Sequence, residues 1–142
     1  MKQIAFLALF LCAQLSNAQN VKGKWVTYDD DTKKPKSEVE IYERDGYYWG
    51  KVIALFNRPA GEGEVICKKC SGDKKNKPVV GLNIVEKMKK SGSEFKGGTI
   101  TDPANGKSYT CVFYLDPKDP NTLVVKGYVG PFNRAQYWKR AK

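Results

Sequence analysis

Two cysteines, Cys67 and Cys70, are separated by two residues, a spacing that is compatible with several kinds of chemistry. Such a pair can be a redox centre, half of a zinc site or a local structural disulfide. A redox pair usually opens a helix whose dipole lowers the thiol pKa, but glycine-containing turns flank this pair on both sides. Zinc needs four ligands, and the chain contains no histidine. The pattern therefore favours a disulfide between Cys67 and Cys70, and no metal site.

Of the two other cysteines, Cys12 lies in the N-terminal apolar run, and Cys111 shares one face of an alternating segment with Tyr109 and Phe113. A disulfide from Cys111 to Cys67 or Cys70 would close a longer loop and stabilise the fold more, by about 4 rather than about 2 kcal/mol. Its apolar neighbours nevertheless predict a buried, reduced thiol.

Five lysines crowd the connection that holds the cysteine pair. They are Lys68, Lys69, Lys74, Lys75 and Lys77, in a chain with 25 basic and 15 acidic residues. Such a cluster could bind anions, and for an exported protein these are lipid phosphates or acidic glycans rather than nucleic acid. The alternative is an ordinary charged face that keeps the protein soluble.

The absence of histidine excludes imidazole-based triads and histidine-ligated metals. The run Asp29-Asp30-Asp31 lacks the alternating oxygen ligands and the glycine of a calcium loop, so a solvated turn is expected. A carboxylate pair for glycoside hydrolysis depends on a separation in space, and no segment singles one out. We therefore expect no enzymatic activity and no cofactor. The less favoured alternative, an enzyme without histidine, would have to use carboxylates, lysine, tyrosine or thiols.

The first eighteen residues have the layout of a secretory signal peptide. Lys2 precedes nine apolar residues at positions 4–12, and small residues lead up to Ala18. The apolar run is too short to span a bilayer, which needs about 20 residues. We expect cleavage after Ala18, no transmembrane segment, and a single exported domain over residues 19–142, periplasmic or secreted.

The remaining chain has the alternation and turn residues of a β protein rather than a helical stripe. Short β-rich segments are bounded by Gly, Pro, Asn and Asp, and Asp45-Gly46 is a typical hairpin turn. The expected strands cover residues 21–28, 37–43, 47–56, 79–89, 95–101, 107–115, 122–129 and 134–140. Hairpin-like connections favour an all-β fold, a small closed antiparallel barrel of about eight strands, because closure removes exposed edges.

Several blocks together resemble one bacterial exported family, domain of unknown function (DUF) 2147. The most specific is the GG-x-I-x-DP-x-NGK-x-Y block that begins at Gly97, and the resemblance extends over about residues 21–140. One departure is Pro131-Phe132-Asn133, which replaces an expected glycine-containing link. The resemblance implies a lipocalin-like (calycin-like) barrel of the cell envelope and assigns no activity.

The Gly23-Lys24-Trp25 opening is similar to the lipocalin motif, in which an inward tryptophan closes one barrel end and an arginine of the last strand packs across it. Arg140 is the expected partner of Trp25. A guanidinium over an indole contributes about 0.5–2 kcal/mol.

These features predict a non-enzymatic barrel that binds a small apolar or amphipathic ligand in the cell envelope. Eight strands enclose room either for side chains alone or for one small ligand. If Tyr109, Phe113 and Trp138 fill the interior, this interpretation fails. The alternative is an interaction protein whose lysine-rich connection docks on anionic lipid or glycan.

Overall fold

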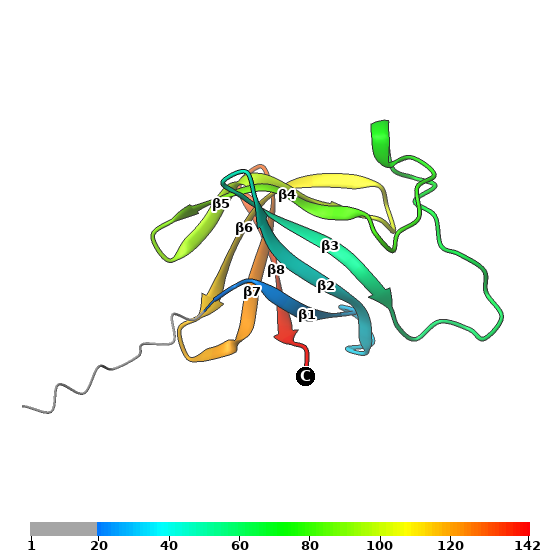
Figure 1. Ribbon diagram of the computed structural model, residues 1–142, viewed down its shortest axis with the longest axis horizontal. Coiled ribbons are helices and arrows are strands. Elements are labelled where there is room, and N and C mark those ends of the chain that lie inside the picture. The colour runs from blue at the N-terminus through cyan, green and yellow to red at the C-terminus, as the bar shows by residue number, and fades with distance from the viewer. Residues whose placement is uncertain (1–19) are drawn as a thin grey trace, which may run out of the picture.

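The computed structural model describes residues 20–142, so the expected signal peptide lies outside the described residues. Each strand pairs antiparallel with its neighbour in sequence, and the last pairs with the first to close a barrel (Figure 1). The strands are β1 (Gly23–Tyr28), β2 (Pro35–Arg44), β3 (Tyr47–Leu55), β4 (Asn83–Ser91), β5 (Glu94–Asp102), β6 (Lys107–Asp116), β7 (Asp119–Val129) and β8 (Phe132–Arg140). The predicted all-β, eight-stranded antiparallel barrel is confirmed. No helix in residues 20–142 is long and apolar enough to cross a bilayer.

The main boundary error concerns the start of β4, which is Asn83 and not Val79. The backbone of Val79 instead donates to Val65 within the preceding connection, at 2.8 Å. A turn then follows, in which Leu82 N–H donates to the Val79 carbonyl and Gly81 has a φ of +97°. The apolar run at 79–82 is therefore buried as part of a connection, and alternation alone could not separate it from the strand.

Tight hairpins fix the register of the strands. Asp45 and Gly46 have φ values of +54° and +78°, the conformation that a two-residue type I′ turn requires. The β7–β8 link is also only two residues long, Gly130 and Pro131, with Gly130 at a φ of +56°. The substituted link thus makes a short hairpin that leaves the barrel intact.

Aromatic and apolar side chains fill one end of the barrel. Trp25 is fully buried, and its indole N–H donates to the Val21 carbonyl at 2.8 Å. The Phe95 ring packs between Phe113 and Tyr48, with centroid distances of 4.9 and 4.7 Å. We call this the closed end. The opposite, open end is formed by the β1–β2, β3–β4, β5–β6 and β7–β8 connections, of which β3–β4 (residues 56–82) is by far the longest (Figure 1).

Candidate ligand-binding cavity

The open half of the barrel encloses a cavity of about 550 Å³. Its wall is largely apolar and comes from most of the strands: Val52, Leu55, Ile84, Ile100, Tyr109, Val125 and Trp138. Phe113 belongs to the filled half, whereas Tyr109 and Trp138 form part of the cavity wall. The three residues that could have filled the interior therefore leave its open half hollow.

The inward-facing residues of β7 explain why part of the barrel interior is empty. On β7, Leu123, Val125 and Gly127 face inward in turn, and the last of them has no side chain. A Cβ atom at Gly127 would lie 3.6 Å from the Tyr109 Cβ, which is ordinary contact, and its φ is not in the left-handed region. The glycine thus leaves space that a side chain could occupy without backbone strain.

Polar groups of the wall are bonded to one another. The hydroxyls of Thr27 and Ser37 share a hydrogen bond of 2.6 Å. The Trp138 indole N–H donates to the side-chain amide oxygen Oε1 of Gln136 at 3.2 Å, and the side-chain amide nitrogen Nε2 of Gln136 donates to the Asp30 carboxylate. Within residues 20–142 no buried side-chain nitrogen or oxygen lacks a partner. Because Thr27, Ser37, Gln136 and Trp138 already have partners, an apolar ligand would leave none of these groups unpaired.

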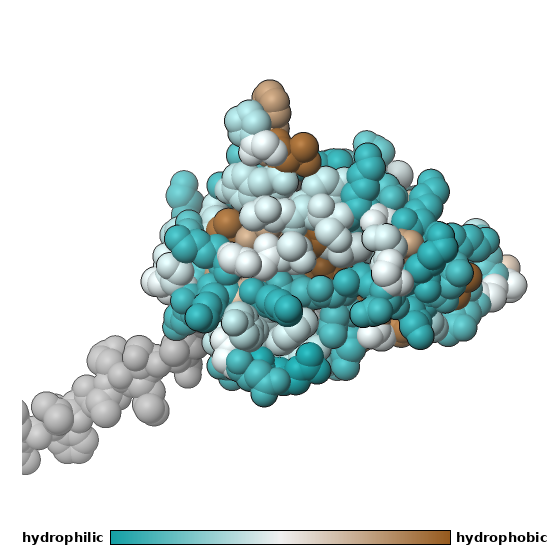
Figure 2. All heavy atoms as spheres, turned by 90° about the horizontal axis from the view of Figure 1, so that it is seen from above, coloured by the Kyte–Doolittle hydropathy of each residue, from teal (hydrophilic) through white to brown (hydrophobic). Residues whose placement is uncertain are grey.

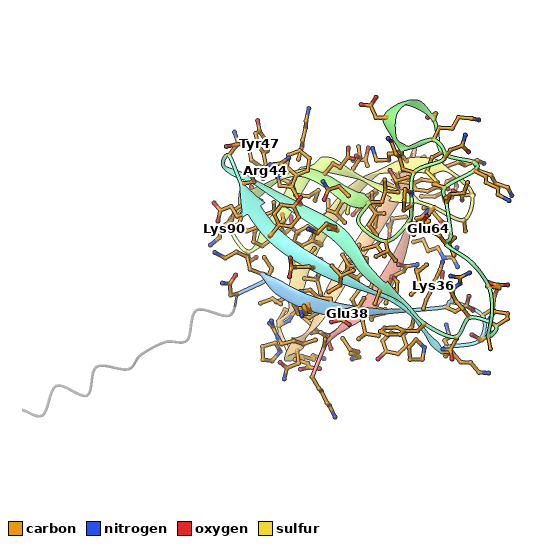
Figure 3. The ribbon with its side chains drawn as sticks, turned by 45° about the vertical axis from the view of Figure 1, so that its right-hand side comes forward. Lys36, Glu38, Arg44, Tyr47, Glu64 and Lys90 are labelled. Atoms are coloured by element: carbon orange, nitrogen blue, oxygen red, sulfur yellow. A yellow bond between two sulfur atoms is a disulfide. The ribbon has the colours of Figure 1, made fainter. Side chains whose placement is uncertain are left out.

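The charged side chains that line the cavity are those of Asp30, Lys36, Asp102 and Arg134, near the open end of the barrel. Asp30 forms an ion pair with Arg134, in which the Asp30 carboxylate oxygen lies 2.5 Å from the Arg134 guanidinium nitrogen. Lys36 of β2 also borders the cavity, and Figure 3 shows it at the same end of the barrel as Glu64 of the β3–β4 connection. Arg44, Tyr47 and Lys90 lie at the other end (Figure 3). The mouth can therefore meet a polar head group while the interior meets an apolar tail.

The β3–β4 connection forms one side of the mouth. Val65 and Val79 line the cavity, and an isolated β-bridge joins Ile66 to Pro78. Between them, Cys67 and Cys70 are joined by a disulfide that is almost completely buried. We call residues 67–77 the disulfide segment. The structure thus brings the predicted cysteine pair to the rim of the cavity.

The disulfide segment packs on the β5–β6 turn, residues 103–106. The Cys67 sulfur lies 3.5 Å from the Pro103 carbonyl oxygen. Gly106, at a φ of +73°, is so close to the Lys69 carbonyl that a Cβ atom would overlap it. Pro103, in turn, lines the cavity, so the segment supports part of its wall.

Four of the five predicted anion-binding lysines, Lys68, Lys69, Lys75 and Lys77, are exposed. Lys74 is half-buried and forms an ion pair with Glu86, 2.5 Å from its carboxylate. No other ion pair among the described residues involves these lysines. The structure therefore leaves four exposed lysines in one short segment.

The predicted Trp25–Arg140 pair lies at the closed end, away from the cavity. The Arg140 guanidinium carbon is 4.3 Å from the Trp25 ring centroid. The same guanidinium donates to the carbonyl oxygens of Asn20, at 3.0 Å, and Pro120, at 3.2 Å. This pair therefore joins the segment before β1 to the last strand at the base of the barrel, and neither residue lines the cavity.

The other sequence candidates offer little reactivity. Burial raises the pKa of the Cys111 thiol to about 12, so it stays protonated and is a poor nucleophile. The Asp29 carboxylate accepts hydrogen bonds from the backbone of Asp31 and Thr32, and the Thr32 bond is the main cause of its lowered pKa. Across residues 20–142, no three acidic, cysteine or histidine side chains meet in a way that could hold a metal.

Family comparison agrees with the fold. Residues 23–140 match the family model of an uncharacterized protein conserved in bacteria, DUF2147. The chain belongs to this family. No curated protein matches it.

One solved structure resembles the barrel of this DUF2147 member closely. It is protein HP1028 from the human pathogen Helicobacter pylori, which is described as belonging to the lipocalin family. The two share 20% sequence identity with a TM-score of 0.71, over 87% of this chain and 84% of that one. At this identity the similarity shows a common lipocalin-like fold.

Sequence reasoning predicted a ligand inside the barrel but did not identify the residues that line the cavity. Apolar inward residues such as Val52, Ile84 and Val125 look the same in the sequence whether they fill a core or line a hollow. The one available signal was Gly127, which interrupts the inward row of β7 where a barrel core would need a side chain.

Proposed function

We propose that this protein binds one small apolar or amphipathic ligand in the open half of its barrel, without enzymatic activity. The observation that carries the proposal is the cavity of about 550 Å³ with an apolar wall and a closed base. Ligand pockets usually have volumes of about 300–1,000 Å³ and few polar groups. Two basic side chains, Lys36 and Arg134, and two acidic ones, Asp30 and Asp102, border the mouth and would bind the polar head group of an amphipathic ligand.

We further propose that the protein works in the cell envelope after export. The signal-like residues 1–18 and the Cys67–Cys70 pair support this location, because disulfides persist in oxidising compartments. An envelope location would bring the cavity near lipids and their breakdown products.

Native mass spectrometry of the protein purified from its own host tests the proposal directly. We expect a co-purified mass that organic extraction removes, and binding of the apolar fluorophore N-phenyl-1-naphthylamine by the extracted protein. Wild-type protein that carries no extractable ligand and does not bind the fluorophore would refute ligand binding.

Variants at two glycines locate the binding. Gly127→Phe places a ring in the cavity and should weaken fluorophore binding at least tenfold, by roughly 1.4 kcal/mol or more. Gly63→Phe is the matched control, because its Cβ would meet nothing within 4 Å in the exposed β3–β4 connection. Equal binding by both variants would place the fluorophore outside the barrel.

A second candidate function is docking on anionic lipid or glycan through Lys68, Lys69, Lys75 and Lys77. It is favoured by their exposure and by the absence of ion pairs to them among the described residues. Binding to phosphatidylglycerol vesicles should fall steeply towards about 1 M salt, where charges are screened within about 3 Å. Substitution of the four lysines by glutamine should have the same effect, and unchanged binding would exclude this segment.

A further inference from the structure

The tip of the β7–β8 hairpin exposes two large apolar side chains. Phe132 is 77% exposed and Val129 is 62% exposed, more than any other large hydrophobic side chain in residues 20–142. They are direct partners across the hairpin, so both project to the same side of it. With Pro131 between them, they form one apolar patch, which we call the hairpin tip.

The hairpin tip continues the inner surface of the barrel beyond its rim. Val129 follows Val125 and Gly127 in the inward row of β7, and Phe132 precedes Arg134 and Gln136 in that of β8. Both tip residues border the cavity. The inner face of this hairpin is therefore an apolar surface that leads from the cavity out to solvent.

The shape of the tip indicates what it fits. The two-residue turn projects from the molecule, and Figure 2 shows hydrophobic atoms protruding from the surface at the position of this hairpin. A protein partner would have to provide a matching groove, whereas the interfacial layer of a bilayer admits a projecting apolar group without one.

Charge on the same rim points to an anionic bilayer. The disulfide segment contains five lysines and one acidic residue, Asp73. It packs on the β5–β6 turn, which borders the same cavity mouth as Phe132. Basic side chains beside an exposed apolar group favour membranes that carry anionic lipids.

We propose that the protein docks on anionic membranes with its open end, and that Val129 and Phe132 enter the interfacial layer of the bilayer. Docking places the cavity mouth on the membrane surface. An apolar ligand then passes between bilayer and cavity along the inner face of the hairpin without crossing water. This exchange step rests on the proposed ligand binding, whereas the docking itself does not.

Vesicle sedimentation tests the docking. The probes are vesicles of phosphatidylcholine with phosphatidylglycerol, and vesicles of phosphatidylcholine alone. The double variant Val129→Ser/Phe132→Ser should bind the anionic vesicles at least tenfold more weakly than wild type. The control Tyr137→Ser removes a 56% exposed ring from β8 outside the tip and should bind like wild type.

A fluorescent label reports the orientation. Among residues 20–142, Cys111 is buried and Cys67 is bonded to Cys70. In protein expressed from residue 19, which lacks Cys12, Phe132→Cys therefore supplies the accessible thiol for an environment-sensitive dye. Anionic vesicles should shift the dye emission to the blue at position 132. The same dye on Ser93→Cys, in the β4–β5 turn of the closed end, should not respond.

The outcomes separate the two proposals. Weak vesicle binding by the tip variant, with normal binding of N-phenyl-1-naphthylamine in solution, supports docking through the tip. Wild-type affinity in the tip variant, or equal dye shifts at positions 132 and 93, overturns it. Failure of the proposed function gives a different result, because wild-type protein would then dock on vesicles without binding the fluorophore. That result would refute the exchange step and leave the docking supported.

Discussion

Arg140 combines a ring contact with several hydrogen bonds, and this combination decides which substitutions it should tolerate. Its planar guanidinium lies over Trp25 while its N–H groups reach the carbonyl oxygens of Asn20 and Pro120. A lysine keeps the charge but cannot stack flat and donate in several directions at once.

We therefore predict that Arg140→Ala lowers the free energy of unfolding by about 2 kcal/mol, and that Arg140→Lys restores less than half of it. Urea unfolding followed by tryptophan fluorescence measures both. Arg134→Lys is the control, since that side chain is 71% exposed and should matter by less than about 0.5 kcal/mol. Full rescue by lysine would show that charge alone is needed at position 140.

Cys111 should make the protein sensitive to alkaline pH. Its thiol remains protonated in the folded protein up to a pKa of about 12 because it is buried, whereas the unfolded chain loses this proton from about pH 9. The unfolded state then binds fewer protons, so stability falls as pH rises between these values, by up to about 1.4 kcal/mol per pH unit.

Urea unfolding at pH 8 to 11 should therefore show a steeper loss for wild type than for Cys111→Ala. Lysine and tyrosine titration is common to both proteins and cancels in the difference. Parallel curves would contradict the burial of the thiol, and so would rapid alkylation of Cys111 in the folded protein.

At the scale of elements, the disulfide segment stabilises the cavity wall more than it stabilises the barrel as a whole. The bond closes a loop of only a few residues, so its effect on the unfolded chain is small. Its sulfurs are nevertheless buried against the β5–β6 turn, which the segment holds in place.

Replacing both Cys67 and Cys70 by alanine should lower the free energy of unfolding by about 1–2 kcal/mol and leave the barrel intact. Trypsin should then cut at the segment lysines much faster than in wild type, as mass mapping of the fragments would show. Cys111→Ala, which leaves the segment bonded, should keep the wild-type pattern. Loss of the whole far-ultraviolet β signal would mean that the bond is required for the barrel.

Strand elements were more predictable from the sequence than the site. Alternation and turn residues are local properties, so all eight strands were expected, and only their ends shifted, as at Asn83. The cavity depends on which inward side chains meet across the barrel, and Ile84 or Val125 carries no mark of this in the sequence. The exposure of Phe132 likewise follows from the assembled sheet, in which Val129 and Phe132 pair with each other but with neither β6 nor β1.

At the scale of the whole molecule, the seam with the fewest paired residues joins the first strand to the last. The first and last strands share two residue pairs, Trp25 with Arg140 and Val26 with Lys139, whereas β7 and β8 share eight. One further hydrogen bond, from the Ala141 N–H to the Lys24 carbonyl, lengthens this seam. Local opening starts where the fewest interactions must break.

Hydrogen exchange should therefore be at least tenfold faster for the Ala141 amide than for amides within the β6–β7 pair, such as that of Val125. Nuclear magnetic resonance can follow the individual amides. Arg140→Lys should speed exchange at the seam more than in β6 and β7. Uniform exchange rates around the barrel would show that it opens only as a whole.

In protein made from residue 20 onward, both chain ends meet at the closed end, so the order of the strands in the gene can be changed. Arg140 holds Asn20 by a hydrogen bond, so a short linker could join the two ends far from the cavity mouth. Since every strand pairs with its neighbour in sequence, new ends could then be opened at a turn such as Gly92-Ser93. In such a circular permutant, β8 and β1 would be joined covalently as a hairpin. The same residues would line the cavity, although their order in the chain would differ.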